Sequence, residues 1–249
     1  HGRQEVGAAV TAETNVDGDP FTMQPIHDAT ATAAAYKETL YRRVLGTDDK
    51  TEIGDATARS PLGGLAATPL GGLRDAVAAA VMHATCAGGL STELENAFAF
   101  ATSKVSRGKA QGLTIEQVAV INLYTQESCF YKGLNGALGG WGTDGRSAIP
   151  HYLLCLKILV DALAVLPKVE TTAYRGIKNV PLQTLLDGKG VGDTLEWWAI
   201  TSTTETADVL RDPIFFGLGA DQEERVVFVL KVRSGVRVKA FSALGSDLE

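Results

Sequence analysis

The spacing of apolar residues changes along the chain, and the change falls near residue 167. Between residues 27 and 166, Ala, Leu and Val recur every three to four positions, which is the period of one face of a helix. From residue 168 onward this period gives way to short strand-like runs with turn residues between them. The pattern predicts an α+β fold, in which a helical lobe precedes a β-rich core.

Five segments of the helical lobe have the apolar period of an α-helix. Several of them begin with Ser or Thr in a capping position and end at Gly. The predicted helices cover residues 27–46, 73–88, 91–108, 114–139 and 147–167. Residues 1–26 have little periodicity and many Gly, Asp, Thr and Pro, so we expect a loose arm there. The division is therefore an arm over 1–26, a helical lobe over 27–166 and a β-rich core over 167–249, with 27–249 forming one domain.

The β-rich core contains four segments that are typical of strands. They cover residues 171–178, 194–204, 225–232 and 236–241. The last two read as a pair joined by a short turn at Ser234 and Gly235. Because the segments follow one another without long helices between them, they predict a largely antiparallel sheet packed against the helical lobe.

Composition and charge exclude some classes of function. The chain has 249 residues, of which 45% are hydrophobic and 21% charged, as in ordinary soluble globular proteins. Its net charge of −6 argues against a broad nucleic-acid or anionic-membrane surface. The longest apolar run, residues 149–167, carries His151, Lys157 and Asp161, so a buried core helix is expected and a transmembrane segment is not.

Cysteine usage says little about the compartment. The three cysteines, Cys86, Cys129 and Cys155, are odd in number and none belongs to a C-x-x-C pair, so free and buried thiols are expected. Free thiols favour a reducing compartment, although a secreted toxin or effector can also lack disulfides. Localisation stays open.

Two short motifs could carry chemistry. In YRGI, residues 174–177, an Arg lies in a predicted strand with a Gly after it. Such an Arg is usually a surface residue, but its guanidinium is also the preferred fork for phosphate, and Gly permits close approach of a ligand. In ITSTT, residues 200–204, a run of hydroxyls ends the next strand, which usually marks strand termination and a helix cap. Hydroxyls that face the same cleft as the Arg would orient a sugar.

The order of these motifs resembles the Arg-Ser-Glu class of mono-ADP-ribosyltransferases, which includes vertebrate ecto-transferases and several bacterial toxins. A strand with Y-R-G precedes a strand ending in W-W-x-I-T-S-T-T, a Phe-bearing PIFFG loop, hydrophobic strands and an acidic stretch. Upstream, TIEQVAVINLYTQESCFYKGLNGALG is similar to the family's helical segment with "YT, then L-N-x-x-L". The resemblance covers residues 113–249 and implies a split β-sandwich with a NAD-binding cleft and no metal.

The resemblance also implies roles for single residues of the Y-R-G and S-T-T motifs. Arg175 would bind a phosphate of NAD and steady the nicotinamide ribose, while the backbone of Gly176 would bind the nicotinamide amide. Tyr174 belongs to the same cofactor-binding motif. Ser202 would orient the catalytic acid.

Two further pairs complete the implied site. Thr203 and Thr204 would complete a Ser-Thr-Ser-like motif on the cofactor side of the cleft. One of Phe215 and Phe216 would lie against the nicotinamide ring, and core packing is the alternative for each of them.

The family needs a carboxylate beside the ribose, because cleavage of the nicotinamide bond develops positive charge on the sugar. The acidic stretch 221–225 precedes a predicted strand and reads as a solvated turn. The stretch FSALGSDLE, residues 241–249, follows the last strand. There Asp247 takes the place that guides the acceptor, and Glu249 takes the place of the catalytic acid. The pair Leu-Glu is also what a cloning junction leaves behind, so both origins stay open for Glu249.

The predicted activity is transfer of ADP-ribose from NAD to a protein side chain, with arginine as the favoured acceptor. Two alternatives remain. In the first, water replaces the acceptor and the protein is a NAD glycohydrolase. In the second, a catalytically silent module of the same fold binds NAD or a partner. NAD and a protein acceptor are the expected partners, nucleic acid is not, and a monomer is the expected state.

Overall fold

The structure is a computed structural model, and it describes part of the chain. It covers residues 10–11, 71–81, 90–140, 145–178, 180–186, 188–193, 195, 197, 199–211 and 225–244. The predicted helix over 27–46 lies outside these ranges. So do four of the proposed site residues, Phe215, Phe216, Asp247 and Glu249.

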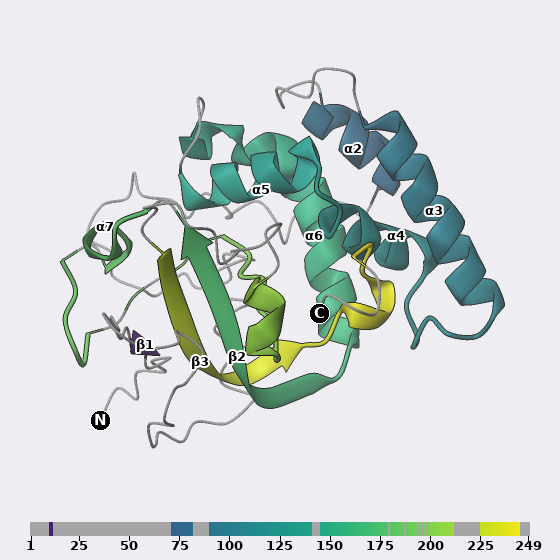
Figure 1. The fold of residues 1–249 in the computed structure, drawn as a ribbon. Helices are drawn as coiled ribbons and strands as arrows, with labels where there is room; N and C mark the ends of the chain where they lie inside the picture. The colour runs from purple at the N-terminus through teal and green to yellow at the C-terminus, as the bar shows by residue number, and fades with distance from the viewer. Residues whose placement is uncertain are drawn as a thin grey trace, which may run out of the picture.

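Helices α2 to α6 gather on one side of the molecule and strands β2 and β3 lie on the other (Figure 1). The helices are α2 (Leu73–Val81), α3 (Ser91–Ser106), α4 (Ile115–Tyr124), α5 (Cys129–Gly139) and α6 (Ile149–Val165), with a 3₁₀ turn, η1 (Gly145–Ala148), before α6. Their buried faces form one shared apolar core, which includes Phe130, Leu159 and Phe241. The α+β prediction is confirmed, because this helical side packs beside an antiparallel sheet.

The predicted helix over 114–139 is wrong as a single helix, because the chain breaks between α4 and α5. Thr114 and Gln117 form a capping box that starts α4. At the other end, Thr125 Oγ1 donates back to the carbonyls of Ile121 and Asn122, at 3.1 and 2.9 Å. Ser128 is extended (φ −131°, ψ 165°) and precedes α5. Both helices bury apolar faces, so the periodicity continues across the break and hides it.

Helix α6 is the most apolar element that the structure describes. By length and composition, the segment Gly145–Val165, with 21 residues and an 18-residue window of mean hydropathy 1.7, is long and apolar enough to cross a membrane. Of its apolar window, 44% is buried inside the structure, and core helices of soluble proteins pass the same test. The buried side chains include Tyr152, Cys155 and Leu159, so α6 serves as a core helix in this fold.

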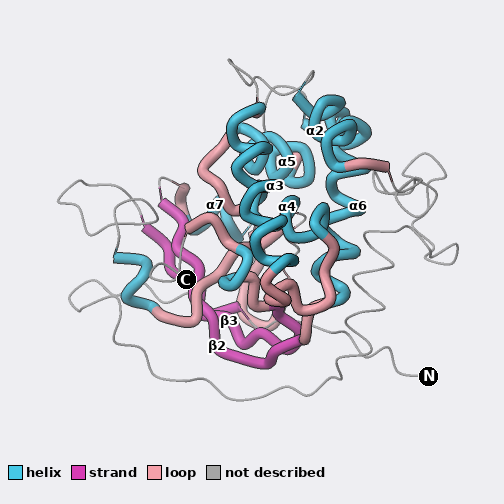
Figure 2. The backbone as a smooth tube through the Cα atoms, turned by 90° about the vertical axis from the view of Figure 1, so that its right-hand side faces the viewer, coloured by secondary structure: helices cyan, strands magenta, loops and turns pink. Residues whose placement is uncertain are grey.

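The sheet consists of three antiparallel strands in the order β1-β3-β2. They are β1 (Val10–Thr11), β2 (Lys168–Lys178) and β3 (Arg225–Val236). The two long strands pair from Lys168 opposite Val236 to Lys178 opposite Arg225, with a bulge between Val169 and Thr171. In Figure 2 these strands lie below the helices.

Three predictions in the β-rich core are wrong for the residues that the structure describes: the hairpin turn, the strand after it and the strand over 194–204. Ser234 and Gly235 do not form a hairpin turn, because Gly235 pairs with Val169 and β3 continues through both residues as one strand. After it comes a 3₁₀ turn, η3 (Lys239–Phe241), where a strand was expected. The described residues of 194–204 form no strand apart from an isolated bridge between Thr204 and Tyr174.

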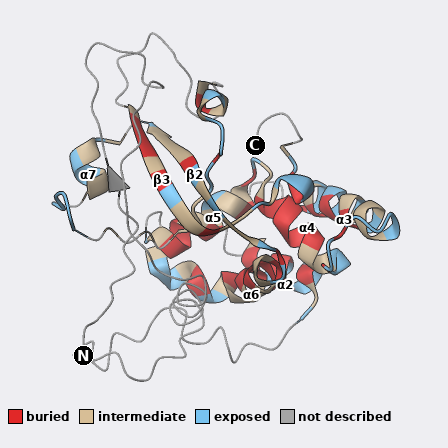
Figure 3. Cartoon of the chain, turned by 90° about the horizontal axis from the view of Figure 1, so that it is seen from below, coloured by how far each residue is buried: buried red, intermediate tan, exposed pale blue. Residues whose placement is uncertain are grey.

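Each face of the sheet has its own small apolar cluster. On one face Val226, Phe228 and Leu230 are buried against Trp197 and helix α7 (Leu182–Leu186). On the other face Val227 and Tyr174 pack against Leu210 of η2 (Ala207–Arg211). Figure 3 shows buried residues along both β3 and α4. Val226, Val227 and Phe228 are buried in succession, as expected of a strand with two covered faces.

The prediction of free cysteines is confirmed for one residue and wrong for another. Cys155 is a free, buried thiol in α6. Cys129, the first residue of α5, is disulfide-bonded. An odd count of three leaves room for one disulfide beside one free thiol, so the count could not distinguish these arrangements.

Candidate functional site

Arg175 lies near the middle of β2, directly opposite Phe228 of β3. Its side chain is half-buried, and its Nη1 donates to the backbone oxygen of Ser202 at 2.9 Å. The guanidinium carbon lies 5.8 Å from the centre of the Trp197 ring, which itself packs edge-on against Phe228 at 5.0 Å. The pairing of β2 with β3, together with the Trp197 and Phe228 rings, therefore fixes the position of this guanidinium.

The positive charge of Arg175 has no carboxylate partner in the ranges that the structure describes. Burial lowers the pKa of Arg175, and electrostatic interactions with Tyr124 and Tyr131 act in the opposite direction. Arginine nevertheless remains charged at neutral pH, because its ordinary pKa is far above that range. A half-buried guanidinium that no described carboxylate neutralises is suited to an anionic ligand.

The Ser202 segment, defined as residues 199–206, runs beside β2. The N–H of Tyr174 donates to Thr204 O at 2.7 Å, and the N–H of Thr204 donates to Tyr174 O at 3.0 Å. Ser202 and Thr203 are exposed, whereas Thr204 is buried. Thr204 Oγ1 accepts from the N–H of Thr206 at 3.2 Å, so this hydroxyl is used within the turn. Of the three predicted hydroxyl residues, Ser202 is the one held against Arg175.

Tyr174 and Gly176, the neighbours of Arg175 in β2, lie on the other face of the sheet. Side chains alternate along a strand, so Tyr174 points to the face opposite Arg175, where it packs with Leu210 and Val227. The structure thus does not bring the Tyr174 side chain to Arg175. Gly176 pairs with Val227, and its role toward a ligand stays a prediction.

Two residues of the helical lobe contact the Ser202 segment, and neither was among the predicted site residues. Asn135 of α5 accepts from the N–H of Ile200 at 3.2 Å and donates through Nδ2 to the Tyr124 hydroxyl at 2.8 Å. Tyr124, at the end of α4, donates to the Ile200 carbonyl at 3.4 Å. Both lie in the segment that resembles "YT, then L-N-x-x-L". This resemblance was the sequence signal that could have identified them.

The tyrosines near Arg175 are neutral hydrogen-bonding groups. Burial raises the pKa of Tyr124, while hydrogen bonds with the Asn135 and Ser202 side chains and the charge of Arg175 act against this shift. Burial also raises the pKa of Tyr131, whose ring packs edge-on against Tyr124 at 6.2 Å. Both phenols therefore keep their protons at neutral pH, and Arg175 supplies the charge.

The Phe-Ser pair of the chain's C-terminal region lies against the same end of α4. Phe241 and Ser242 are both buried. Asn122 Nδ2 donates to the Phe241 carbonyl at 3.1 Å, and the N–H of Ala243 donates to Thr125 Oγ1 at 2.9 Å. The segment that leads toward the predicted acids is therefore anchored one turn from Tyr124. Asp247 and Glu249 lie outside the described residues, so their roles stay predictions.

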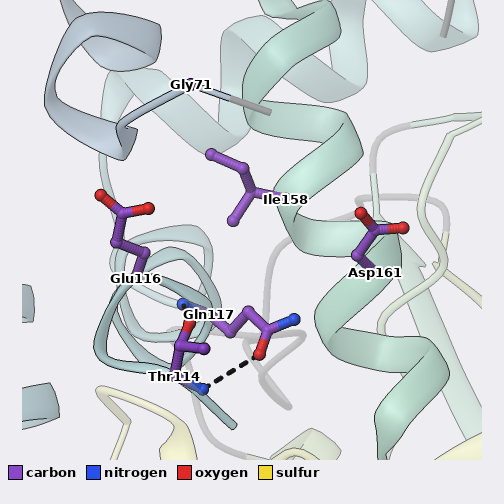
Figure 4. Close-up of a pocket in the computed structure, with 6 residues that line it drawn as sticks. All are labelled: Gly71, Thr114, Glu116, Gln117, Ile158 and Asp161. Carbon is purple, nitrogen blue, oxygen red and sulfur yellow. Dashed lines mark hydrogen bonds between the residues drawn. The ribbon is translucent and has the colours of Figure 1, made fainter. Parts of the chain in front are cut away.

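A pocket of about 210 Å³ lies elsewhere, between α4 and α6 (Figure 4). Its lining consists of Gly71, Thr114, Glu116, Gln117, Ile158 and Asp161. The carboxylates of Glu116 and Asp161 lie on opposite sides of it, and the lining includes no basic side chain (Figure 4). This charge is wrong for the phosphates of a dinucleotide, so the pocket is not part of the Arg175 site.

Neither a metal site nor a protein family can be assigned from the following observations. Within the described ranges, no group of three or more His, Cys, Asp or Glu side chains is arranged to hold a metal ion. Comparison of the chain with family models, curated proteins and solved structures finds no match.

Proposed function

We propose that this protein is a NAD-dependent mono-ADP-ribosyltransferase that transfers ADP-ribose to a protein side chain, with arginine as the favoured acceptor. One observation carries the proposal. The half-buried guanidinium of Arg175 contacts the Ser202 backbone and has no carboxylate partner among the described residues. A pyrophosphate matches such a guanidinium in charge and in hydrogen-bonding geometry.

The finer fold belongs to the same proposal. A split β-sandwich needs chain on both sides of the Arg-bearing strand. The long pairing of β2 with β3 on one side, and the bridge of Tyr174 with Thr204 on the other, support this arrangement. The Arg and Ser motifs lie on neighbouring segments, as the family resemblance requires.

In the proposed reaction, the bond between ribose C1′ and the nicotinamide nitrogen breaks, and nicotinamide leaves with the bonding electron pair. A nitrogen of the acceptor side chain then forms a bond to C1′ and loses a proton. Arg175 holds the phosphates, and Glu249 stabilises the positive charge that develops on the ribose. Ser202 orients that acid, the backbone of Gly176 binds the nicotinamide amide, Phe215 or Phe216 covers the ring, and Asp247 guides the acceptor.

Labelled NAD tests the proposal. The protein is incubated with NAD labelled in its adenylate half and with a cell lysate, and protein-bound label and free nicotinamide are measured. We expect label on protein in step with nicotinamide release. Nicotinamide release without labelled protein would assign the glycohydrolase alternative. Neither product, together with measurable NAD binding, would assign the silent module.

Arg175→Lys is the most direct variant, because Lys keeps the charge but not the two-pronged donor geometry. We expect NAD binding at least about tenfold weaker by calorimetry. Arg237→Lys is the matched control, since Arg237 is an exposed β-region arginine already paired with Glu205. Equal affinity in the wild type and Arg175→Lys would remove Arg175 from the site.

Ser202→Ala and Glu249→Gln separate positioning from charge stabilisation. For Ser202→Ala we expect kcat to fall more than the affinity for NAD, because the hydroxyl acts on the orientation of the acid. For Glu249→Gln we expect loss of turnover with NAD binding retained. Glu224→Gln is the control from the other acidic stretch. If Glu224→Gln abolished turnover and Glu249→Gln did not, the acid would be assigned to residues 221–225.

A further inference from the structure

The last turn of α4 contacts two segments that are far apart in sequence. Tyr124 holds the Ser202 segment, and the next residue, Thr125, holds Ala243. Successive residues on a helix point about 100° apart, so adjacent side chains can serve two different neighbours. We infer that this turn, through Tyr124 and Thr125, is a positioning element that fixes the Ser202 segment relative to residues 241–243.

Thr125 is fully used as a hydrogen-bonding group. Its hydroxyl lies 3.1 Å from Ile121 O and 2.9 Å from Asn122 O, and it accepts from the N–H of Ala243 at 2.9 Å. A hydroxyl has one proton to donate and lone pairs to accept with. Donation to the helix carbonyls therefore points its lone pairs away from α4, toward Ala243.

A second contact fixes the same segment, and α3 supports it. Asn122 is buried and donates to the Phe241 carbonyl at 3.1 Å. Its Oδ1 accepts from Gln126 Nε2 at 3.1 Å, and Gln126 Nε2 also lies 3.1 Å from the carbonyl of Glu93 in α3. The amide orientation of Asn122 is thereby set, so residues 241–243 are held at two points.

The Ser202 segment is held from the other side of the same turn. Tyr124 and Asn135 together contact the backbone N–H and carbonyl of Ile200. Helix α4 itself is rigidly packed, because Val118, Val120 and Leu123 are fully buried. Any movement of one segment relative to the other must therefore break hydrogen bonds to one helix turn.

The consequence for chemistry rests on the proposed function. Ser202 lies in one of the two segments, and the predicted acids follow the other. Misplacement of a reacting group by about 1 Å can lower a rate by about a hundredfold. Tyr124 and Thr125 are thus positioning residues for the proposed reaction, and neither is proposed to touch the reacting atoms.

Thr125→Val, Thr125→Ser and Ser106→Ala test the inference in the full chain. Valine keeps the shape of Thr125 and removes the hydroxyl, serine keeps the hydroxyl, and Ser106→Ala removes a comparable helix hydroxyl in α3. Single-residue amide exchange is measured by NMR. We expect the Ala243 amide to exchange about fivefold faster in Thr125→Val and at the wild-type rate in the other two variants. An unchanged Ala243 amide in Thr125→Val would overturn the inference.

Tyr124→Phe gives the matching test on the other segment. We expect faster exchange at Ile200, because Asn135 loses its partner and holds that amide less firmly. Tyr152→Phe, which removes a buried phenol hydroxyl from α6, is the control. Equal exchange at Ile200 in wild type and Tyr124→Phe would overturn this half of the inference.

Ala243→Pro, alone and combined with Thr125→Val, tests the same contact from the other segment, so the inference can still be tested if Thr125→Val misfolds. Ala243→Pro removes the donor N–H and leaves α4 intact, and Ser242 already has the extended backbone (φ −69°, ψ 148°) that a following proline requires. We expect Ala243→Pro and Thr125→Val each to lower kcat about tenfold with little change in the KM for NAD, and the double variant to be no worse than either. Additive losses would overturn the inference. If the wild type turns over no NAD, the proposed function fails, and the amide-exchange results still decide the positioning role.

Discussion

The helical lobe and the sheet are built on cores of very different extent. Helices α2 to α6 share one continuous apolar core, whereas the described sheet has a small cluster on each face. Side chains next to the sheet, such as Ile200 and Val238, also pack against the helical core. Among the described residues, the larger apolar core therefore belongs to the helices, whereas the proposed site lies on β2 and in the Ser202 segment, which α4 and α5 contact through polar side chains.

Phe130 and Phe228 offer the largest test of this contrast, because both are fully buried, one in each region. We expect Phe130→Ala to lower the free energy of unfolding by about 3–5 kcal/mol in urea titrations, since it opens a cavity in the shared core. Phe228→Ala removes the same group from the smaller cluster. We expect it to speed amide exchange in β2 and β3 and to change Trp197 fluorescence, with helix amides still protected. Loss of helix protection in Phe228→Ala would show that the two regions unfold as one.

The second largest effect is expected from alkaline pH, which should lower the free energy of unfolding of the helical lobe. Burial raises the pKa of the Cys155 thiol from 9.0 to about 12, and burial raises the pKa of Tyr152 in the same helix. A raised pKa means that the unfolded chain loses its proton first, so stability present below pH 9 is lost as pH rises toward 12. The loss from Cys155 between about pH 8 and about pH 11 is about 3 kcal/mol, measured by urea unfolding at the two pH values. In Cys155→Ala the dependence on pH should be shallower, and an identical slope would contradict the prediction.

Gly133→Ala tests the contact between α5 and α6. A Cβ at this position would collide with the Tyr152 hydroxyl and lie 3.1 Å from its Cζ. Tyr152 is buried and cannot swing away, so we expect a loss of about 1–3 kcal/mol in thermal or urea unfolding. Adding Tyr152→Phe removes the hydroxyl and should restore part of the loss. If the double variant lost more stability than Gly133→Ala alone, the steric explanation would be contradicted.

The smallest effect is expected at the sheet surface. Glu205 and Arg237 form a two-pronged ion pair at 3.0 and 2.8 Å, but both side chains are exposed. Because Arg237 lowers the pKa of Glu205, the pair contributes above the ordinary carboxyl range and is lost as pH falls through the lowered pKa. We expect Glu205→Gln to leave the unfolding midpoint nearly unchanged at physiological salt. A large shift would show that this pair fastens the Ser202 segment to the residue that follows β3.

The sequence predicts the helices better than the strands. Helices α2 and α3 begin at the expected residues, Leu73 and Ser91, where the apolar period starts and an acidic residue lies in the first turn. The predicted strand over 171–178 is confirmed as part of β2. The hairpin at Ser234 and Gly235 fails, because a Ser-Gly pair signals a turn locally while pairing with Val169 keeps it extended. Tertiary pairing overrides turn propensity at that point.

The site could be predicted only in part. The proximity of Arg175 and Ser202 follows from the order of motifs, and the structure places them in contact. Tyr124 and Asn135 were not identified, because helical periodicity separates buried from exposed faces and does not say which polar group meets a distant backbone. Their partner, Ile200, is 76 and 65 residues away in sequence.

The bulge in the pairing of β2 with β3 also constrains how the length of this chain can change in evolution. Arg175 faces Trp197 because an even alternation runs from Thr171 to Arg175 without interruption. A single inserted or deleted residue within that stretch would turn the guanidinium to the face of Leu210. At the bulge, the step from Val169 to Thr171 in β2 lies opposite a step one residue longer in β3, from Gly235 to Val232, so the extra residue belongs to β3. Relatives of this protein should therefore vary in length within β3, between Val232 and Gly235, and keep a fixed count from Thr171 to Arg175.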